Sequence, residues 1–420
     1  MSFQQGLSGL NASSKNLEVI GNNIANANTY GSKMARAEFS AVYATALNGS
    51  GGSTVGIGTA LQAVAQQFTQ GNVSTTDNPL DLAINGSGFF QVSDNSGTVT
   101  YTRNGQFKLD RDGYIVNNAA DRLMGYAADD NGMVQPGRLV PLQLPTGGID
   151  PNPSTRAEIE LNFDSRKAVT QPAAAPLIDF ASANTYNNAT SLTLYDMKGQ
   201  EVSLGLYFQK TGNDAWDVYA TANGTTVGGT AAAPLPITSI SFQSDGSGPI
   251  SPNAPVTLNI PASTNAAGAQ TEAISGLLFD FSGVTQFGSA YGITDMRQDG
   301  FSAGQLNSIA IEANGIVTAR YSNGQSKPAG QIELATFRNP QGLQPLADNA
   351  WARTYASGDP IYGVPGDAKF GVLQAGALEE SNIDLTGELV NMITAQRIYQ
   401  ANAQTIKTQD QVLQTLVNLR

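Results

Sequence analysis

The chain has 420 residues, of which 40% are hydrophobic and 13% are charged, and its net charge is −12. This length exceeds what one hydrophobic core usually serves, so we expect two or three domains. An acidic chain repels phosphate backbones, which argues against a nucleic-acid partner. The sequence contains no run of about 20 apolar residues, so we expect no membrane insertion.

Cysteine and histidine are both absent. Their absence removes disulfides, thiol catalysis, and the commonest general base and metal ligand. We therefore expect no catalytic residue, no cofactor and no metal site, although a carboxylate enzyme remains open at this point. The pair Asp110 and Asp112 before Gly113 could begin a calcium loop. Further ligands do not follow at the required spacing, so we interpret this segment as a turn between strands.

The N-terminal segment predicts a helix over residues 2–26. Apolar or small residues recur in it at alternating steps of four and three, which is the pattern of one face of a coiled-coil helix. This N-terminal stripe consists of Phe3, Leu7, Leu10, Ser14, Leu17, Gly21 and Ile24. The segment has no basic region, unbroken apolar core or clear cleavage site, so we expect export without a cleaved signal peptide.

The middle of the chain changes to a period of two, which is typical of β-strands. Turn dipeptides such as Asn223-Gly224 and Asn314-Gly315 separate the apolar runs. Trp216 alternates with Val218, which favours core packing over a sugar-stacking surface for this side chain. The predicted strands are 83–84, 89–92, 98–102, 191–195, 202–208, 216–220, 237–242, 256–260, 308–312, 317–321 and 331–337.

The C-terminal segment predicts a second helix, over residues 384–420, with the same four-three rhythm. Its C-terminal stripe consists of Leu385, Leu389, Met392, Gln396, Tyr399, Ala403, Ile406, Asp410, Leu413 and Val417. Further apolar residues lie off this stripe, among them Val390, Ile393 and Ile398. A single partner helix cannot cover all of them, so the excess indicates burial against neighbouring copies of the chain.

The expected fold is multidomain and mainly β, with α-helical coiled-coil termini and nested domains. We assign 1–30 and 380–420 to terminal helices and 31–70 to a connector, which is Gly-rich over 45–58. Residues 71–147 and 288–379 are expected to form an inner β domain. Residues 148–287 are expected to form an inserted outer, β-barrel-like domain.

Several stretches of the sequence resemble the bacterial flagellar rod, hook and hook-associated axial family, and within it the hook proteins. They are SGLNASSKNLEVIGNNIANANTYGSK at 8–33, NGSGFFQV at 85–92, YTRNGQFKLDRDGYIVNNAADRLMGY at 101–126 and SNIDLTGELVNMITAQRIYQANAQTIKTQDQVLQTLVNLR at 381–420. Shorter matches, at 191–212, 279–289 and 321–343, lie between the last two of these. Ser32 stands where hook proteins usually carry Phe, so we expect weaker docking of that turn.

The resemblance implies a structural subunit, not an enzyme, that polymerises into a curved flexible tube outside the cell. Such a hook acts as a universal joint between rod and filament and encloses an export channel. Implied partners are further copies of the chain, the rod, hook-cap and hook–filament junction proteins, and the flagellar type III export apparatus. The large apolar members of the two stripes would mediate self-assembly, namely Phe3, Leu7, Leu10, Leu17, Ile24, Leu385, Leu389, Met392, Tyr399, Ile406, Leu413 and Val417. A polar set would line the channel: Gln396, Arg397, Gln404, Lys407 and Gln414.

Two alternatives remain open from the sequence. One is a distal rod subunit, which shares both chain ends with hook proteins but has a shorter middle. The other is a secreted β-rich protein that binds or hydrolyses carbohydrate. Straight polymers would identify the first alternative, and monomers with saccharide affinity the second.

Overall fold

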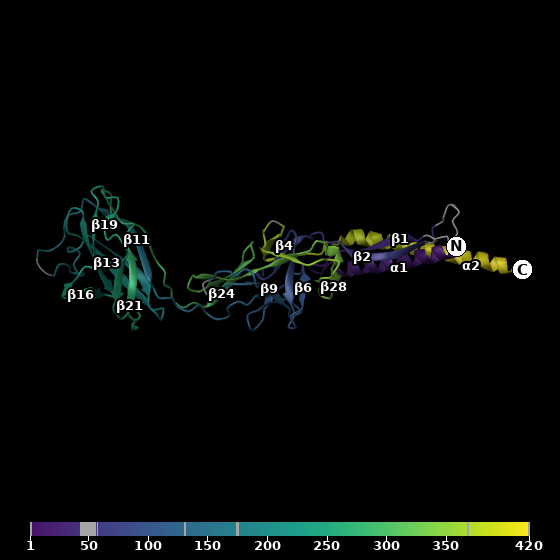
Figure 1. The fold of residues 1–420 in the computed structure, drawn as a ribbon, viewed down its shortest axis with the longest axis horizontal. Coiled ribbons are helices and arrows are strands. Elements are labelled where there is room, and N and C mark those ends of the chain that lie inside the picture. The colour runs from purple at the N-terminus through teal and green to yellow at the C-terminus, as the bar shows by residue number, and fades with distance from the viewer. Residues whose placement is uncertain are drawn as a thin grey trace. The chain divides into compact units, whose positions relative to one another are not determined.

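The structure is a computed structural model that describes residues 2–42, 56, 58–129, 132–173, 176–367 and 369–418. The chain forms two compact units. The first unit comprises Met1–Thr146, Ser308–Arg320 and Ser326–Arg420, and the second comprises Gly147–Asn307 and Tyr321–Gln325. The second unit is therefore inserted into the first. The mainly β architecture with helical ends that the sequence predicts is confirmed (Figure 1).

Helices α1 (Ser2–Asn26) and α2 (Leu385–Asn418) pack against each other in the first unit (Figure 1). Within the described residues, neither contains an apolar stretch sufficient to cross a bilayer. A hairpin of β1 (Ala35–Val42) and β2 (Gly58–Gln66) packs against α1. The sequence prediction treats this region as a connector, because Ala and Gly in β2 give no period-two signal. Most of the Gly-rich part, 45–58, lies outside the described residues.

The β region of the first unit is built mainly on one 13-stranded sheet. Two further strand pairs join its beginning to its end, namely β3 with β32 and β4 with β31. A short 3₁₀ helix, Pro340–Gly342, lies among these elements. The strands are β3 (Val73–Thr75), β4 (Leu82–Asn85), β5 (Phe89–Ser93), β6 (Val99–Thr102), β7 (Lys108–Leu109), β8 (Ile115–Val116), β9 (Arg122–Ala127), β10 (Val140–Pro141), β24 (Leu306–Ile311), β25 (Ile316–Tyr321), β26 (Ser326–Ile332), β27 (Leu334–Thr336), β28 (Gln344–Pro345), β29 (Ala350–Ala352), β30 (Ile361–Gly363), β31 (Val372–Ala375) and β32 (Ala377–Glu379).

The second unit consists mainly of two sheets, with strand orders β20-β21-β11-β22 and β12-β13-β14-β18-β19. Strand β23 pairs with β11, β15 pairs with β14, and β16 pairs with β17. The strands are β11 (Arg156–Asp164), β12 (Asn188–Tyr195), β13 (Glu201–Lys210), β14 (Ala215–Ala222), β15 (Thr225–Val227), β16 (Gly229–Thr230), β17 (Ala233–Pro234), β18 (Thr238–Phe242), β19 (Pro249–Ser251), β20 (Val256–Ile260), β21 (Ile274–Asp280), β22 (Thr285–Phe287) and β23 (Gly292–Gln298).

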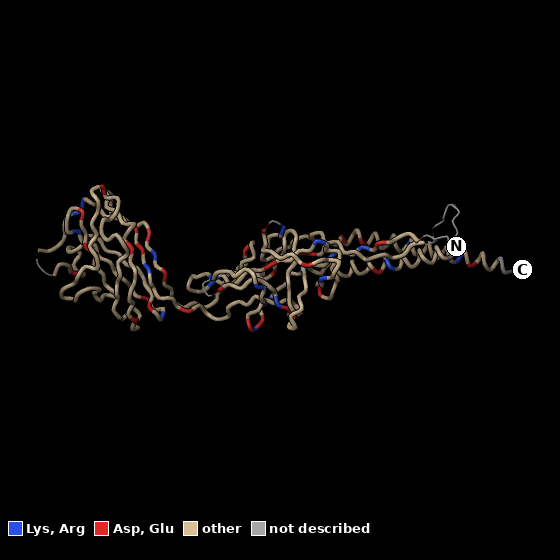
Figure 2. Tube along the Cα trace, viewed as in Figure 1, with Lys and Arg blue, Asp and Glu red and all other residues tan. Residues whose placement is uncertain are grey.

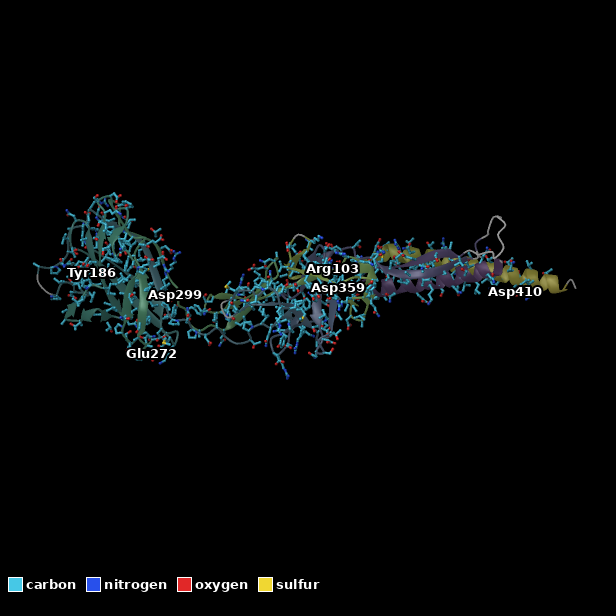
Figure 3. The ribbon with its side chains drawn as sticks, viewed as in Figure 1. Arg103, Tyr186, Glu272, Asp299, Asp359 and Asp410 are labelled. Atoms are coloured by element: carbon cyan, nitrogen blue, oxygen red, sulfur yellow. The ribbon has the colours of Figure 1, made fainter. Side chains whose placement is uncertain are left out.

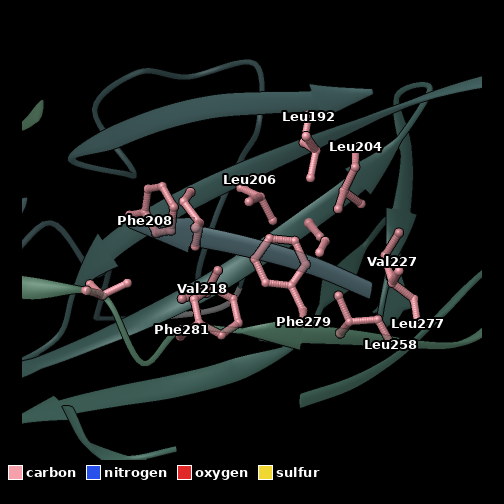
Figure 4. Close-up of a cluster of buried hydrophobic side chains, with 14 of the residues drawn as sticks. Leu192, Leu204, Leu206, Phe208, Val218, Val227, Leu258, Leu277, Phe279 and Phe281 are labelled. Carbon is pink, nitrogen blue, oxygen red and sulfur yellow. The ribbon is translucent and has the colours of Figure 1, made fainter. Parts of the chain in front are cut away.

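The core of the second unit is filled by alternating side chains from both sheets (Figure 4). Trp216 and Val218 are fully buried in it, which confirms the core position predicted for Trp216. The Trp216 ring stacks on Phe163 with 4.4 Å between ring centroids. Its indole N–H donates to the Gln286 side chain at 2.6 Å, so the one polar atom of the ring is satisfied.

The insertion differs at its boundary from the sequence expectation. That expectation ends the inserted domain at residue 287, whereas β23 pairs antiparallel with β11 and the second unit continues to Asn307. None of the residues of β23 is fully buried, so its sequence gives only a weak strand pattern. Strand β11 has a clear alternation, with Ala157, Ile159 and Leu161 buried, yet it was not predicted.

The predicted strands from 83–84 to 317–321 are confirmed as parts of strands in the structure, apart from small differences at their ends. The predicted strand 331–337 is instead divided into β26 and β27 at Glu333. The Glu333 carboxylate is 1% exposed and accepts hydrogen bonds from the Tyr126 hydroxyl and from Gln91 Nε2. No cation pairs with it among the described residues.

Burial raises the pKa of Glu333 above its ordinary value, and the two hydrogen bonds oppose this only in part. A raised pKa in the folded state means that Glu333 favours folding at acid pH. This contribution is lost as the pH rises through the raised pKa. In the wild type, the unfolding free energy of the first unit should fall as the pH rises above the ordinary pKa of glutamate. We expect Glu333→Gln to abolish this fall. Urea unfolding at a series of pH values measures this.

Hydrogen exchange in β13 and β14 of the second unit provides the internal control, because these strands lie in a different core. An identical pH profile for wild type and Glu333→Gln would contradict the assignment.

Candidate self-assembly surface

The buried face of α1 is not the N-terminal stripe. Its most buried positions are Gly6, Ser13, Ile20 and Asn23, each one residue before a stripe position. One residue turns an α-helix by about 100°, so the stripe is rotated away from the packing face. Leu7 is 45% exposed. Leu10, Leu17 and Ile24 are half-buried, and the side chain of Phe3 lies outside the described residues.

Small residues on α1 allow close approach of α2. A Cβ added to Gly9 would lie 2.8 Å from the Asn402 side chain, and one added to Gly6 would lie 3.1 Å from Ile406. The Asn402 amide donates to Ser13 Oγ at 3.4 Å. The two helices are thus joined by small and polar positions, with apolar stripe residues at the margins of the contact.

The C-terminal stripe is also mostly outside this contact. On α2 the buried residues are Glu388 and Ala395, while Met392 and Ile406 are half-buried. The side chain of Val417 lies outside the described residues. Six members of the stripe are exposed, namely Leu385, Leu389, Gln396, Tyr399, Asp410 and Leu413.

An apolar surface therefore remains uncovered on the terminal helices. Leu389, Val390 and Ile393 are between 44% and 59% exposed on the first turns of α2. The hairpin adds a second apolar surface, where Phe39 lies opposite Leu61 in the strand register and both are exposed. Lys, Arg, Asp and Glu are sparse along α1 and α2 (Figure 2). These surfaces fit an apolar partner better than a charged one.

The predicted channel-lining residues lie on one face of α2. At about 100° per residue, all five fall within an arc of about 100°. This arc lies on the opposite side of the helix from Ala395 and Asn402, which face α1. All five side chains are exposed: Gln396, Arg397, Gln404, Lys407 and Gln414. From Gln396 onwards this face is therefore polar and exposed, whereas Leu389 and Ile393 give the same side of the helix an apolar character in its first turns.

Two asparagines that the sequence prediction missed tie the chain ends to the hairpin and its flanking residues. Asn23 exchanges two hydrogen bonds with the backbone of Ala35, at 2.8 and 2.9 Å. Asn382 accepts from the Met34 N–H and donates to the Gln67 carbonyl, both at 2.8 Å. Because their partners come from distant segments, no local sequence pattern marks these residues.

The turn that contains Ser32 is docked without an aromatic side chain. Ser32 is 6% exposed, and the neighbouring Gly31 N–H donates to the Glu379 carbonyl at 2.8 Å. Gly31 has a φ of 71°, and a Cβ there would lie 2.5 Å from the backbone nitrogen of Asn104. This turn therefore requires glycine, both for its backbone conformation and for its close approach to the β region.

Two lysine or arginine side chains meet a single carboxylate beside this turn. Lys33 and Arg103 both contact Glu379, and all three side chains are buried (Figure 3 labels Arg103).

The calcium-loop candidate is an ordinary turn between β7 and β8, where the Asp110 carboxylate accepts hydrogen bonds from the Asp112 and Tyr114 N–H groups. Within the described ranges, no group of three or more His, Cys, Asp or Glu residues could hold a metal.

Family models match the chain in four places. They are described as "Flagella basal body rod protein" at 3–33, "Flagellar hook protein FlgE/F/G D1 domain" at 83–162, "Flagellar basal body protein FlaE D2 domain" at 160–301 and "Flagellar basal body rod FlgEFG protein C-terminal" at 374–419. The matches at the two ends fall on α1 and α2, which carry the exposed apolar residues.

Curated relatives match along the whole chain. The sequence is 41% identical to the flagellar hook protein FlgE of Salmonella typhimurium and 39% identical to that of Escherichia coli, each with full coverage of both chains. It is 31% identical to the FlgE of Borreliella burgdorferi, over 100% of this chain and 99% of that one. The crystal structure of Helicobacter pylori hook protein FlgE2 is similar in fold, with a TM-score of 0.53 at 16% identity. That match covers 73% of this chain and 100% of the other.

The close packing of α1 on α2 is testable with three matched substitutions. Gly6→Leu and Gly9→Leu should separate the helices, because their added side chains collide with Ile406 and Asn402. Gly21→Leu is the control, since nothing lies within 4 Å of a Cβ at that exposed position. Leu favours a helix over Gly by roughly 1 kcal/mol, so the control should keep or gain helicity.

Thermal unfolding followed by the helical circular dichroism signal measures the effect. Equal transition temperatures for the three variants would show that α1 does not pack on α2 through these glycines.

Proposed function

This chain belongs to the flagellar hook protein family, and from that premise we propose that it is a structural subunit of the bacterial flagellar hook which polymerises through its terminal helices. Full-length similarity to hook proteins favours this function over the distal-rod and carbohydrate-binding alternatives. In this proposal the protein works by forming a lattice and not by catalysing a reaction.

One observation carries the proposal: the ends of the chain bear more apolar surface than the molecule covers. Leu389, Val390 and Ile393 lie together on α2 and are among its exposed large hydrophobic residues. Full burial of a side chain of this size stabilises an assembly by about 1.5–3 kcal/mol. Repetition of the contact in every subunit makes this surface suited to a helical polymer of identical chains.

The terminal helices have a division of labour that supports polymerisation. Small and polar residues such as Gly9 and Asn402 join α1 to α2 inside one subunit. Apart from Ile406, which packs on Gly6, the apolar residues of the stripes are thereby left for contacts between subunits, because they need not close the helix pair. We place the self-assembly contacts on the stripes and on the hairpin pair Phe39 and Leu61.

The polar face of α2 supports a channel-facing role for the C-terminal half of the helix. Gln404 and Lys407 are exposed on the side away from α1. A hydrated lining offers no apolar surface to which an unfolded exported chain could adhere. In this arrangement subunits leave the cell through the flagellar type III apparatus. They meet the rod, hook-cap and junction proteins at the ends of the tube.

The hairpin holds part of the predicted connector in place. Strands β1 and β2 pair over the whole of Ala35–Val42, and Ser8 bonds to both backbone groups of Thr59. The described part of segment 31–70 is therefore held to α1 and does not act as a free linker. We place the flexibility of a curved tube in polar contacts between β faces of adjacent subunits, which exchange partners at small cost.

Charge placed on the exposed apolar patch should prevent assembly without unfolding the subunit. We expect Leu389→Asp and Ile393→Asp to abolish polymers, because a carboxylate buried without a partner is strongly unfavourable. Gln400→Asp is the matched control, being exposed on the same side of α2. Electron microscopy of concentrated protein, with sedimentation velocity for the dispersed state, measures polymer formation.

Circular dichroism of each variant verifies that the β units remain folded. Normal tubes from Leu389→Asp and Ile393→Asp would refute the proposed contact, and loss of tubes in Gln400→Asp would show that any added charge is disruptive.

A further inference from the structure

Lys33, Arg103 and Glu379 form a buried ionic cluster in the first unit, which we call the Glu379 cluster. Lys33 Nζ lies 2.6 Å from Glu379 Oε1, and Arg103 Nη1 lies 3.0 Å from Oε2. Their side chains are 1%, 6% and 0% exposed for Lys33, Arg103 and Glu379, respectively. Water cannot screen charges that are this deeply buried, so the cluster depends on its own internal pairing.

The cluster joins segments that are far apart in the sequence. Lys33 follows α1, Glu379 ends β32 shortly before α2, and Arg103 follows β6 in the β region. Glu379 Oε1 also accepts from the Gly71 N–H at 3.0 Å, where the chain returns from the hairpin. Glu379 itself lies in the segment before α2. Its carboxylate therefore contacts the segment after α1, the segment after the hairpin and the residue that follows β6.

Each of the two cations also donates to one backbone carbonyl, whereas Arg103 Nε is buried without a hydrogen-bond partner among the described residues. Lys33 Nζ donates to Thr69 O at 2.8 Å, and Arg103 Nη2 donates to Gly86 O at 2.9 Å. Thr69 O also accepts from the Asn382 amide at 3.2 Å. If Lys33 were replaced, the Thr69 carbonyl would therefore still accept a hydrogen bond from Asn382.

The cluster holds two cations and one carboxylate, so it carries one excess positive charge. Burial lowers the pKa of Lys33, and its attraction to Glu379 compensates only in part. Repulsion from Arg103 lowers the pKa of Lys33 further, and Arg103 and Glu379 are the charged groups that act on it. An Arg103–Glu379 pair alone would be neutral. Burial lowers the pKa of Arg103 as well, but an arginine keeps its proton in proteins, so Lys33 is the cation that can give up its charge.

We propose that Glu379 is a positioning residue that docks both ends of the chain on the β region as one unit, and that Lys33 keeps this docking reversible. Without Glu379, two like charges would share one buried site, so both the exit from α1 and the approach to α2 lose their attachment. Without Lys33, the remaining pair is neutral and holds the ends more firmly. The docking does not depend on the proposed function, but its consequence for assembly rests on that function. If the docking of the chain ends is reversible, a subunit holds its assembly surface in place only when a neighbouring subunit stabilises it.

Hydrogen exchange of the dilute full-length protein tests the docking separately from polymerisation. In Glu379→Gln, protection of α1 and α2 should fall together by about 100-fold or more, as expected when buried charges lose their partner. In Lys33→Met, protection should be retained or rise. In the double variant Lys33→Met with Glu379→Gln, part of the lost protection should return, because one of two repelling charges is gone.

Glu380→Gln is the matched control. The Glu380 carboxylate accepts a hydrogen bond from the exposed Asn72 amide. The Glu380 backbone N–H donates to the Asn72 carbonyl, and the substitution leaves this bond in place. It should leave protection unchanged. Loss of protection in α1 alone would overturn the coupling of the two ends. A fall in Lys33→Met as large as that in Glu379→Gln would overturn the role of Lys33. If Glu379→Gln does not fold, Lys33→Met decides the proposal by itself.

The pH dependence distinguishes charge from packing. In Glu379→Gln, Lys33 faces Arg103 alone, so alkaline pH should restore helical circular dichroism as Lys33 loses its proton. The double variant, which lacks Lys33, should show no such recovery. Equal alkaline behaviour of the two variants would mean that Glu379 acts through shape and not through charge.

Discussion

The structure depends on contact between the first and last segments of the chain. Helix α1 packs on α2, β3 pairs with β32, and β4 pairs with β31, so these three N-terminal elements each meet a C-terminal one. Such pairings close very long loops, and the entropy of closing a loop grows only slowly with its length. The whole β middle, including the inserted second unit, can therefore lie within this closure. Nested domains follow from this constraint.

The closure is made by residues that are unusual for a coiled coil. Gly6, Gly9 and Ser13 bring α1 close to α2, and Asn402 reaches across to Ser13. Polar positions of this kind specify the register of two helices, because a shifted pair would leave them buried without partners. Packing through small residues also leaves the larger apolar side chains free. Intramolecular folding and assembly thus use different faces of the same helices.

In the first unit, a small number of buried charged groups has a large effect on stability. The chain has a low share of charged residues, and two of its most buried carboxylates, Glu333 and Glu379, lie at structural junctions. Glu333 has only neutral donors and divides a strand, whereas Glu379 has two cations and joins the chain ends. In both cases burial converts a single ionisable group into a determinant of local stability.

The sequence by itself determined the two terminal helices, the β middle and most of its strands, because periods of 3.5 and 2 are local properties of the chain. The alternation in β11 is a local property of the same kind. Only the tertiary structure decided which face of α1 meets α2, that residues 35–66 form a hairpin, and that Lys33 and Arg103 share Glu379. These features rest on contacts between distant segments. A heptad pattern shows that a face is apolar, but not whether its partner is the same chain or another one.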